Sequence, residues 1–283
     1  MELGKINILT IVRPTEYGYF LEDEEGNEVL LPNAYVTEDI KIQGKIEVFI
    51  YNDSEDRITA TTLTPYVQLE EFAYLQVKEV NNFGAFMDWG LPKDLLVPFS
   101  EQKRKIEKGE WHLIFMLKDE MTDRLIGSTR INDYVYFDDI DVKRGDEVDL
   151  LLFNKTELGI NAIVNNMYKG LIFKSDIHKS IKPGDKIKGY VKKVRDDGKI
   201  DLSLNPIGFR QSIDKNTAIL IDTLKANNGF LKLTDKSSPE DINRILGLSK
   251  KAFKRAVGNL YKNKIISLSS NGIKLQNNWH LKK

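Results

Sequence analysis

The 283-residue sequence contains no cysteine, so it can form no disulfide and offers no thiolate as a nucleophile or metal ligand. It contains three histidines, His112, His178 and His280, whose spacing matches no metal-binding motif. We expect each of them to be a structural or surface residue. These absences predict a protein without a metal or cofactor, and the lack of cysteine fits a reducing cytoplasm.

Long apolar runs are also missing. No stretch approaches the roughly 18 apolar residues that a membrane-spanning helix needs, and the N-terminus begins no apolar signal segment. The sequence has no glycine-rich phosphate-binding motif, no histidine-based triad and no metal-spaced carboxylates. The acidic run at 22–25 precedes Gly26-Asn27 and is typical of a hairpin tip. We therefore expect no membrane partner, a cytoplasmic location and no enzymatic activity.

The net charge of zero conceals a gradient along the chain. Residues 1–65 carry 5 Lys/Arg against 13 Asp/Glu, and residues 66–138 carry 9 against 13. Residues 139–207 carry 13 against 11, and residues 208–283 carry 15 against 5. This asymmetry indicates a polyanionic partner for the C-terminal part and a possible protein partner for the acidic N-terminal part.

Three marks repeat along the chain at similar intervals. A glycine beside aromatic or apolar residues recurs at Gly18, Gly84 and Gly159, at intervals of 66 and 75 residues. A glycine before a strand recurs at Gly44, Gly109 and Gly184, at intervals of 65 and 75. A closing strand recurs at 58–62, 125–129 and 200–204, at intervals of 67 and 75. Three marks with nearly the same offsets predict three tandem copies of one β module, at 1–65, 66–138 and 139–207.

Each copy reads as five short strands. In the third copy we expect them at 147–154, 159–164, 168–173, 186–194 and 199–204. Pro183-Gly184 and Asp196-Asp197-Gly198 supply turns around the fourth strand. Five strands in about 65 residues cannot bury both faces as an open sheet, so we expect an OB-type barrel in each copy.

A different pattern follows residue 207. Apolar spacing predicts a helix over 213–227, and Ser238-Pro239 begins a second helix that ends at Gly247. Ser249 caps a third helix, and a hairpin over 265–275 closes the segment. Residues 208–283 thus read as a winged helix-turn-helix domain. The expected fold is mainly β with a C-terminal α/β part: three tandem five-stranded barrels followed by a winged helix.

The repeated module resembles the S1 motif, an OB-fold nucleic-acid binder, through Phe83-Gly84-Ala85-Phe86-Met87-Asp88 and Leu96-Val97-Pro98-Phe99. The whole arrangement resembles the conserved virulence factor B family of RNA-binding regulators from Gram-positive bacteria. Residues 163–173 and 185–204 carry this resemblance most strongly, and it extends over essentially the entire chain.

The S1 resemblance implies a ligand surface of two aromatics around the bend glycine, a histidine on the third strand, and an acidic and a basic residue at the last hairpin. The second copy has Phe83, Phe86, Pro98, Asp119 and Arg124 at these positions. The first copy has Tyr17, Phe20, Pro32, Asp53 and Arg57. The third copy has Leu158, Asn161, Phe173, Arg195 and Lys199. No copy keeps the histidine, which departs from the standard S1 surface.

Exposed aromatics stack bases and nearby cations neutralise phosphates, so these residue types are the candidates for contact with nucleic acid. The candidates are Phe83, Phe86 and Arg124 in the second copy; Tyr168, Phe173, Lys174, Tyr190, Lys192, Lys193, Arg195 and Lys199 in the third; and Lys250, Lys251, Lys254 and Arg255 in the last helix. The alternative interpretation is that the aromatics are core residues and the cations a solvated surface.

The sequence predicts an RNA-binding regulator that holds single-stranded RNA chiefly through the third barrel and the winged helix, and that affects gene expression after transcription. A DNA-binding transcription regulator acting through the winged helix is one alternative. A protein-interaction scaffold using the acidic barrels is the other.

Overall fold

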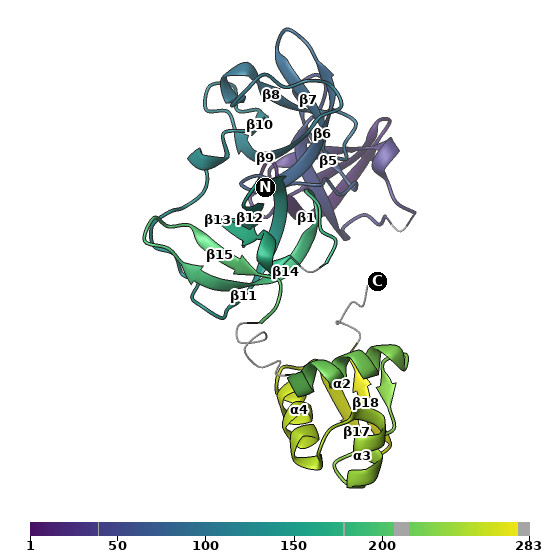
Figure 1. Ribbon diagram of the computed structural model, residues 1–283. Coiled ribbons are helices and arrows are strands. Elements are labelled where there is room, and N and C mark those ends of the chain that lie inside the picture. Colours follow the sequence, from purple (N-terminus) through teal and green to yellow (C-terminus); the bar gives the residue numbers. More distant parts are fainter. Residues whose placement is uncertain (39, 178, 207–214, 277–283) are drawn as a thin grey trace.

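The computed structural model describes residues 1–38, 40–177, 179–206 and 215–276 (Figure 1). His178 and His280 lie outside the described residues, as do the first two positions of the helix expected over 213–227. The strands of barrel 1 are β1 (Ile6–Thr15), β2 (Gly18–Glu22), β3 (Glu28–Pro32), β4 (Lys45–Asn52) and β5 (Ile58–Thr61). Those of barrel 2 are β6 (Phe72–Val80), β7 (Gly84–Asp88), β8 (Leu95–Pro98), β9 (Trp111–Lys118) and β10 (Leu125–Ser128). Those of barrel 3 are β11 (Glu147–Lys155), β12 (Gly159–Val164), β13 (Tyr168–Phe173), β14 (Lys186–Val194) and β15 (Ile200–Ser203).

All three barrels share one strand order, which confirms the predicted repeat. Barrels 1 and 3 are closed, in the orders β1-β2-β3-β5-β4 and β11-β12-β13-β15-β14, each with one parallel pair between its third and fifth strands. Barrel 2 is a five-stranded sheet in the order β10-β9-β6-β7-β8, in which β8 and β10 form no ladder. A short 3-10 turn follows the third strand of each barrel, η1 (Asn33–Tyr35), η2 (Phe99–Glu101) and η4 (Lys174–Asp176). Another turn, η3 (Ile131–Asp133), follows β10.

The bend glycines repeat because a neighbouring backbone occupies the space of a side chain. A Cβ on Gly84 would lie 2.3 Å from the carbonyl oxygen of Val97, and Gly84 has φ +149°. A Cβ on Gly159 would lie 1.9 Å from the carbonyl oxygen of Ile172, and one on Gly18 would lie 2.0 Å from that of Leu31. No residue with a side chain fits such a close approach, so the glycine marks the same point of pairing between the second and third strands in every barrel.

A further repeated feature was not predicted from the sequence. The register between the first and second strands shifts at the same place in each barrel, between Ile11 and Arg13, between Val77 and Glu79, and between Leu152 and Asn154. Such a β-bulge bends the strand and increases its twist, which lets a five-stranded sheet curl into a barrel. No residue type marks this bulge, so it could not be read from the sequence.

The C-terminal segment folds as the predicted winged helix. It contains α2 (Lys215–Ala226), α3 (Pro239–Leu246), α4 (Lys250–Lys262), and the strands β16 (Phe230–Leu231), β17 (Ile266–Ser269) and β18 (Gly272–Leu275). The Ser238 side chain accepts a hydrogen bond from the Asp241 amide, and Gly247 ends α3 in the left-handed conformation. Ser249 caps α4 by accepting from the Ala252 amide. The strand β16, which pairs with β18, was not predicted because it is two residues long.

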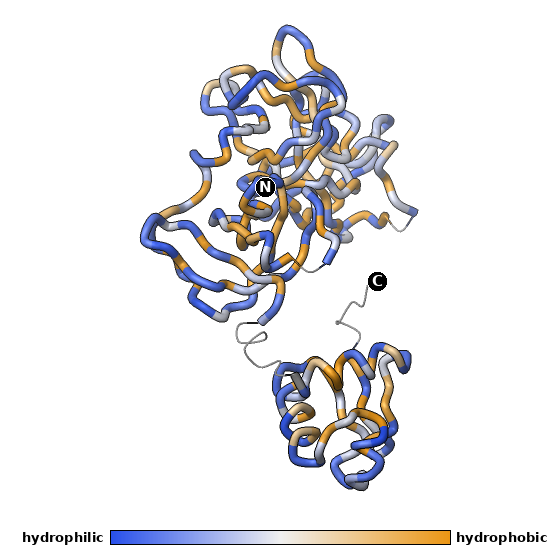
Figure 2. The backbone as a smooth tube through the Cα atoms, viewed as in Figure 1, coloured by the Kyte–Doolittle hydropathy of each residue, from blue (hydrophilic) through white to orange (hydrophobic). Residues whose placement is uncertain are grey.

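Most of the buried side chains in the barrels and in the winged helix are hydrophobic. Along the backbone tube, many loops and hairpin ends are coloured as hydrophilic (Figure 2). The winged helix has its own core, which includes Leu224, Ile242, Phe253 and Leu260. The barrels also share cores. Phe49 of barrel 1 packs edge-on against Trp89 of barrel 2, with ring centroids 5.7 Å apart. A second shared cluster joins barrels 2 and 3.

The cluster between barrels 2 and 3 consists of side chains from the outer surfaces of both. Phe72 and Leu113 come from β6 and β9, Val135 from the connection, and Leu151 and Ile163 from β11 and β12. All five are buried. The isolated bridge between Tyr136 and Tyr168 extends the same junction. Barrels 2 and 3 are therefore held together by a continuous apolar interface.

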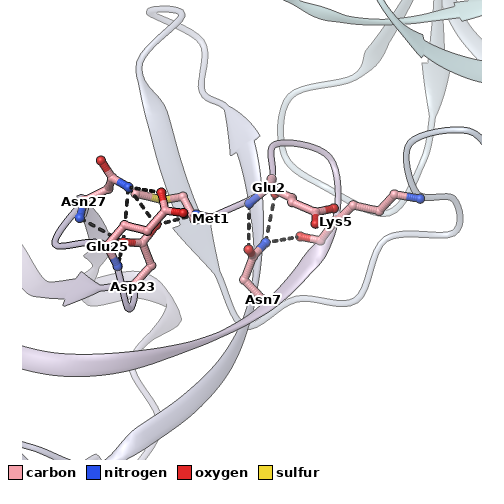
Figure 3. A network of polar contacts seen from close by, with 7 residues as sticks. All are labelled: Met1, Glu2, Lys5, Asn7, Asp23, Glu25 and Asn27. Atoms are coloured by element: carbon pink, nitrogen blue, oxygen red, sulfur yellow. Dashed lines mark hydrogen bonds and ion pairs between the residues drawn. The ribbon is translucent and has the colours of Figure 1, made fainter.

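A polar network fastens the first residues of the chain to β1 and to the hairpin between β2 and β3 (Figure 3). The terminal ammonium of Met1 forms an ion pair with Asp23, and Asn27 donates to the same carboxylate at 2.9 Å. The hydrogen bond from the terminal ammonium lowers the pKa of Asp23. The Asn7 side chain accepts from the Glu2 amide at 2.7 Å and donates to the Glu2 carbonyl at 2.9 Å. Part of the acidic run at 22–25 thus has a structural role at a hairpin tip.

Candidate nucleic-acid interface

The expected S1 surface of barrel 2 is built around Phe83. The Asn81 side chain accepts a hydrogen bond from the Phe83 amide at 2.8 Å, and this turn leaves Phe83 72% exposed. Phe83 and the half-buried Phe86 line a pocket of about 240 Å³. Trp89 forms part of the wall of this pocket and donates its indole N–H to the Lys93 carbonyl at 2.5 Å. The two expected aromatics of this copy therefore share one pocket.

A carboxylate from barrel 1 enters the same pocket. Asp56 lies at the tip of the last hairpin of barrel 1, and its Oδ2 atom is 2.6 Å from Nη2 of Arg124. Its Oδ1 atom is 3.0 Å from Nζ of Lys93. These cations lower the pKa of Asp56, the hydrogen bond from Lys93 having the largest effect. The expected phosphate contact Arg124 is thus ion-paired, and a negative charge stands beside the aromatics.

The expected aromatics of barrel 3 have three different environments. Tyr168 is 2% exposed, and its hydroxyl donates to Oδ1 of Asp141 at 2.7 Å. This burial contradicts the expectation that Tyr168 stacks a base, because its ring packs in the barrel core. Tyr190 is half-buried and donates to Oε2 of Glu147 at 2.8 Å; burial, together with that bond, raises the pKa of Tyr190 to about 12. Phe173 lies on the outside of β13.

Phe173 is the centre of a small cluster of cations. The guanidinium carbon of Arg195 lies 5.7 Å from the centroid of its ring, and Nζ of Lys192 lies 6.0 Å away. Lys193 follows on the exposed side of β14, at a register shift between Val191 and Lys193. We call Phe173, Lys192, Lys193 and Arg195 the outer face of barrel 3. The structure brings Phe173, Lys192 and Arg195 together, and Lys193 is the neighbour of Lys192 along β14.

Carboxylates compensate much of the positive charge around the outer face of barrel 3. Lys192 pairs with Asp176 at 2.9 Å, Arg195 with Asp201 at 2.6 Å and Lys199 with Asp197 at 2.7 Å. Lys174 and Lys193 are exposed and form no ion pair among the described residues. The sequence could not show these pairs, because the numbers of basic and acidic residues in a segment do not say which of them are in contact.

Three of the four cations of α4 lie on the side of the helix away from its core residues. Phe253, Ala256 and Leu260 are buried against the rest of the winged helix. Lys251, Lys254 and Arg255 are exposed and Lys250 is half-buried. Lys251 and Lys254 form no ion pair within the part of the chain that the structure describes. Two cations of the second helical element of the helix-turn-helix are thus available to phosphates.

Comparison with known proteins agrees with this architecture. A family model described as S1 domain matches residues 3–63, one described as S1 RNA binding domain matches residues 76–205, and one described as CvfB-like winged helix domain matches residues 218–275. The protein called YitL of Bacillus subtilis is 31% identical over 93% of this chain and 90% of its own length. The chain belongs to the conserved virulence factor B family. Conserved virulence factor B of Staphylococcus aureus strain MRSA252 is 25% identical, over 96% of this chain and 94% of its own.

A solved structure also aligns with this member of the conserved virulence factor B family. It is a crystal structure of a multidomain protein with nucleic acid binding domains from Streptococcus pneumoniae, with 25% identity, a TM-score of 0.42, and coverage of 97% of this chain and 98% of the other. The matched family models describe S1 and winged-helix modules, which are nucleic-acid-binding types. No helix in the described part of the chain is long and apolar enough to span a membrane.

The described residues contain no cluster of three or more His, Cys, Asp or Glu side chains suited to a metal ion. His112, the one histidine among them, is hydrogen-bonded to Glu110 at 2.9 Å.

A site that sequence reasoning missed is the junction of barrels 2 and 3, where Trp111 is 52% exposed. Trp111 belongs to no S1 motif position, so only its exposure in the fold distinguishes it.

Proposed function

We propose that this protein binds single-stranded RNA through the outer face of barrel 3 and through α4, and that it acts as a post-transcriptional regulator rather than as an enzyme. The observation that carries the proposal is the half-buried ring of Phe173 with Lys192 and Arg195 within about 6 Å of its centroid, in a segment that matches the S1 RNA binding domain. An aromatic with flanking cations offers stacking to a base and charge to its phosphates.

The ion pairs of this face separate two kinds of phosphate contact, by cations that already have a carboxylate partner and by cations that do not. RNA phosphates can replace Asp176 and Asp201 as partners of Lys192 and Arg195, whereas Lys174 and Lys193 offer charge without such an exchange. In α4, Lys251 and Lys254 also offer charge to a phosphate without first breaking an ion pair among the described residues. Barrel 1 is not part of the proposed surface, because its segment carries 13 acidic against 5 basic residues and repels phosphate.

Paired substitutions in the full-length chain test the proposal. We expect Lys174→Gln with Lys193→Gln, and separately Lys251→Gln with Lys254→Gln, to weaken binding of a labelled single-stranded RNA in fluorescence anisotropy. Each lost phosphate contact lowers the slope of log affinity against log salt by about 0.7. Lys41→Gln with Lys45→Gln is the matched control on barrel 1. Equal effects of all three pairs would contradict the proposal.

Truncation is a poorer test than substitution. Removal of barrels 1 and 2 would expose Leu151 and Ile163, which are buried against Phe72 and Leu113. A fragment that fails to bind could then be misfolded rather than incomplete.

The winged helix also supports duplex DNA as a second candidate ligand, since α4 occupies the position that enters the major groove in helix-turn-helix proteins. Competition between unlabelled duplex DNA and single-stranded RNA at one fixed salt concentration separates the two. Preferential displacement by duplex DNA, lost in Lys251→Gln with Lys254→Gln, would favour the DNA alternative.

A further inference from the structure

A cleft of about 720 Å³ opens between barrels 2 and 3, and none of the four residues of the outer face of barrel 3 lines it. Its size lies within the range of roughly 300–1,000 Å³ that is usual for ligand pockets. Side chains of both barrels line it, among them Tyr74, Trp111, Lys103, Arg130, Asn161 and Lys169. The cleft continues the apolar interface formed by Phe72 and Leu113, and Tyr74 packs against that interface. Its geometry therefore depends on the fixed arrangement of the two barrels.

One wall of the cleft is a pair of stacked aromatic rings. Trp111, at the start of β9, lies over Tyr74 of β6, with ring centroids 5.7 Å apart and an angle of 18° between the planes. Tyr74 is itself held in place, because Gly184 of barrel 3 approaches its ring so closely that an added Cβ would lie 3.0 Å from it. Trp111 nevertheless remains 52% exposed. A rigidly held indole with an open surface is suited to stacking a base.

The cations around this wall are largely uncompensated. Lys103, Arg130 and Lys169 form no ion pair among the residues that the structure describes, and Nζ of Lys169 donates to Oδ1 of Asn132 at 3.1 Å. Burial, together with the charges of Lys103 and Lys199, lowers the pKa of Lys169. Asp133 is the one carboxylate among the described residues that line the cleft. An anion would relieve the mutual repulsion of these cations.

The cleft differs from the expected S1 surfaces of barrels 2 and 3 in how far carboxylates neutralise its cations. On barrel 2 Arg124 is paired with Asp56, and on barrel 3 Arg195 is paired with Asp201. In the cleft, by comparison, an exposed aromatic and several unpaired cations occur side by side. Aromatic stacking and phosphate contacts are the two elements by which proteins hold single-stranded nucleic acid.

We propose that this cleft is a nucleotide-binding subsite, in which a base stacks on Trp111 and the adjacent phosphates bind Lys103, Arg130 and Lys169. The nucleotide belongs to the same single-stranded RNA that the outer face of barrel 3 binds, so this part of the inference rests on the proposed function. Lys169 and Phe173 alternate on the outside of β13, about 13 Å apart along the strand. One RNA strand can therefore pass from Phe173 along β13 into the cleft.

The test uses the full-length chain and a fluorescein-labelled ten-residue oligoadenylate RNA in anisotropy titrations. We expect Trp111→Leu to weaken binding by about fivefold or more, as loss of one stacked base does. Lys103→Gln with Lys169→Gln should lower the slope of log affinity against log salt by about 1.4, for two phosphate contacts. Trp111→Tyr, which keeps an aromatic surface, should retain most of the affinity.

The matched control is Lys108→Gln with Lys143→Gln, two exposed lysines of the same barrels that do not line the cleft. Thermal melting of every variant checks that it is folded. If the cleft variants bind RNA like the control while Lys174→Gln with Lys193→Gln loses affinity, the cleft inference is wrong and the proposed function stands. If the unmodified chain binds no RNA, the proposed function is wrong.

Adenosine 5′-monophosphate distinguishes a free nucleotide from a nucleotide of an RNA chain. We expect it to quench the fluorescence of the unmodified chain weakly, to quench Trp111→Leu less, and to compete with the RNA at high concentration. Trp111-dependent quenching by the mononucleotide without any RNA binding would overturn the assignment to RNA. Absence of any Trp111-dependent signal with either probe would overturn the cleft as a nucleotide site.

Discussion

The side chain of Asn166 in barrel 3 accepts a hydrogen bond from the backbone amide of Phe72 in barrel 2, at 2.8 Å. Its Nδ2 atom donates to the Glu70 carbonyl at 2.9 Å. Asn165 and Asn166 both have positive φ, of 50° and 58°, in the turn between β12 and β13. An Asn-Asn turn therefore connects two strands of barrel 3 and also fastens that barrel to the first strand of barrel 2.

Replacement of Asn166 should weaken this connection. We expect Asn166→Gly to lower the free energy of unfolding by about 1–2 kcal/mol, since glycine keeps the positive φ but loses both hydrogen bonds. Asn166→Asp can still accept from Phe72 but cannot donate to Glu70, so its loss should be smaller. Urea denaturation followed by far-UV circular dichroism measures both. A larger loss in Asn166→Asp than in Asn166→Gly would contradict the role of the Phe72 contact.

The apolar interface predicts that barrels 2 and 3 unfold together. Ile163 is 1% exposed and lies among Phe72, Leu113, Val135 and Leu151. We expect Ile163→Ala to cost roughly 2–4 kcal/mol through lost burial and the remaining cavity. The tryptophan signal of barrel 2 and the circular dichroism signal should shift to the same denaturant concentration. Ile8→Ala, at an exposed position of barrel 1, is the control, and separate transitions would show that the barrels are independent.

Barrel 2 contains two glycines, Gly84 and Gly109, that together test whether the bend glycine is required by the close approach of a neighbouring strand. Gly84 and Gly109 both have positive φ, of 149° and 86°, but a Cβ on Gly109 would meet nothing within 4 Å. Gly109→Ala should therefore cost only the backbone strain, about 1–2 kcal/mol. Gly84→Ala adds a 2.3 Å approach to the Val97 carbonyl oxygen and should cost clearly more in the same denaturation assay. Similar losses of stability in the two variants would show that β8 does not exclude a side chain at Gly84.

The lowered pKa of Glu110 leads us to expect that the stability of the fold depends on pH. Hydrogen bonds from Arg104 and His112 lower the pKa of Glu110 from 4.5 to about 2. A carboxyl group whose pKa is lower in the folded state stabilises the fold above its unfolded pKa, and this contribution is lost as the pH falls towards 2. The midpoint of urea denaturation should therefore be lower in Glu110→Gln than in the unmodified chain at pH 7. The difference should shrink between pH 4.5 and 2.

The sequence predicted the parts of this protein that depend on local geometry. The glycines at 18, 84 and 159 repeat because the neighbouring strand leaves no room for a side chain. The Ser238 and Ser249 side chains cap helices by accepting from the amides of Asp241 and Ala252. The expected strands at 159–164, 168–173 and 186–194 match β12, β13 and β14. Local chemistry alone determines such features, so one sequence is enough to find them.

The candidate site was predicted less completely, because it depends on contacts between distant residues. Tyr168 is next to Lys169 in the sequence, but it lies on the inner side of β13 in the core of barrel 3, and its hydroxyl donates to Asp141. Asp56 and Arg124 lie in different barrels, so their pairing has no sequence signal. The stack of Trp111 on Tyr74 likewise joins β9 to β6 and becomes part of a cleft only when barrel 3 is in place.

The last prediction concerns Asp56, which places a negative charge beside Phe83 and Phe86. Asp56→Asn removes that charge and the ion pairs of Arg124 and Lys93 with it, and it keeps the positive φ of 60° that asparagine tolerates. If the aromatic pocket of barrel 2 can bind RNA, the variant should bind the labelled oligoadenylate more tightly. The slope of log affinity against log salt should become steeper by about 0.7 for each freed cation that reaches a phosphate.

Glu55→Gln is the matched control for Asp56→Asn, because Glu55 lies in the same hairpin and pairs with Arg57 of barrel 1 instead of with barrel 2. Equal affinity and equal salt dependence in the unmodified chain and Asp56→Asn would show that Phe83 and Phe86 do not contact RNA even when the carboxylate is absent. In that case the exposed Phe83 would have to serve another contact, and RNA binding would be confined to barrel 3, the inter-barrel cleft and α4.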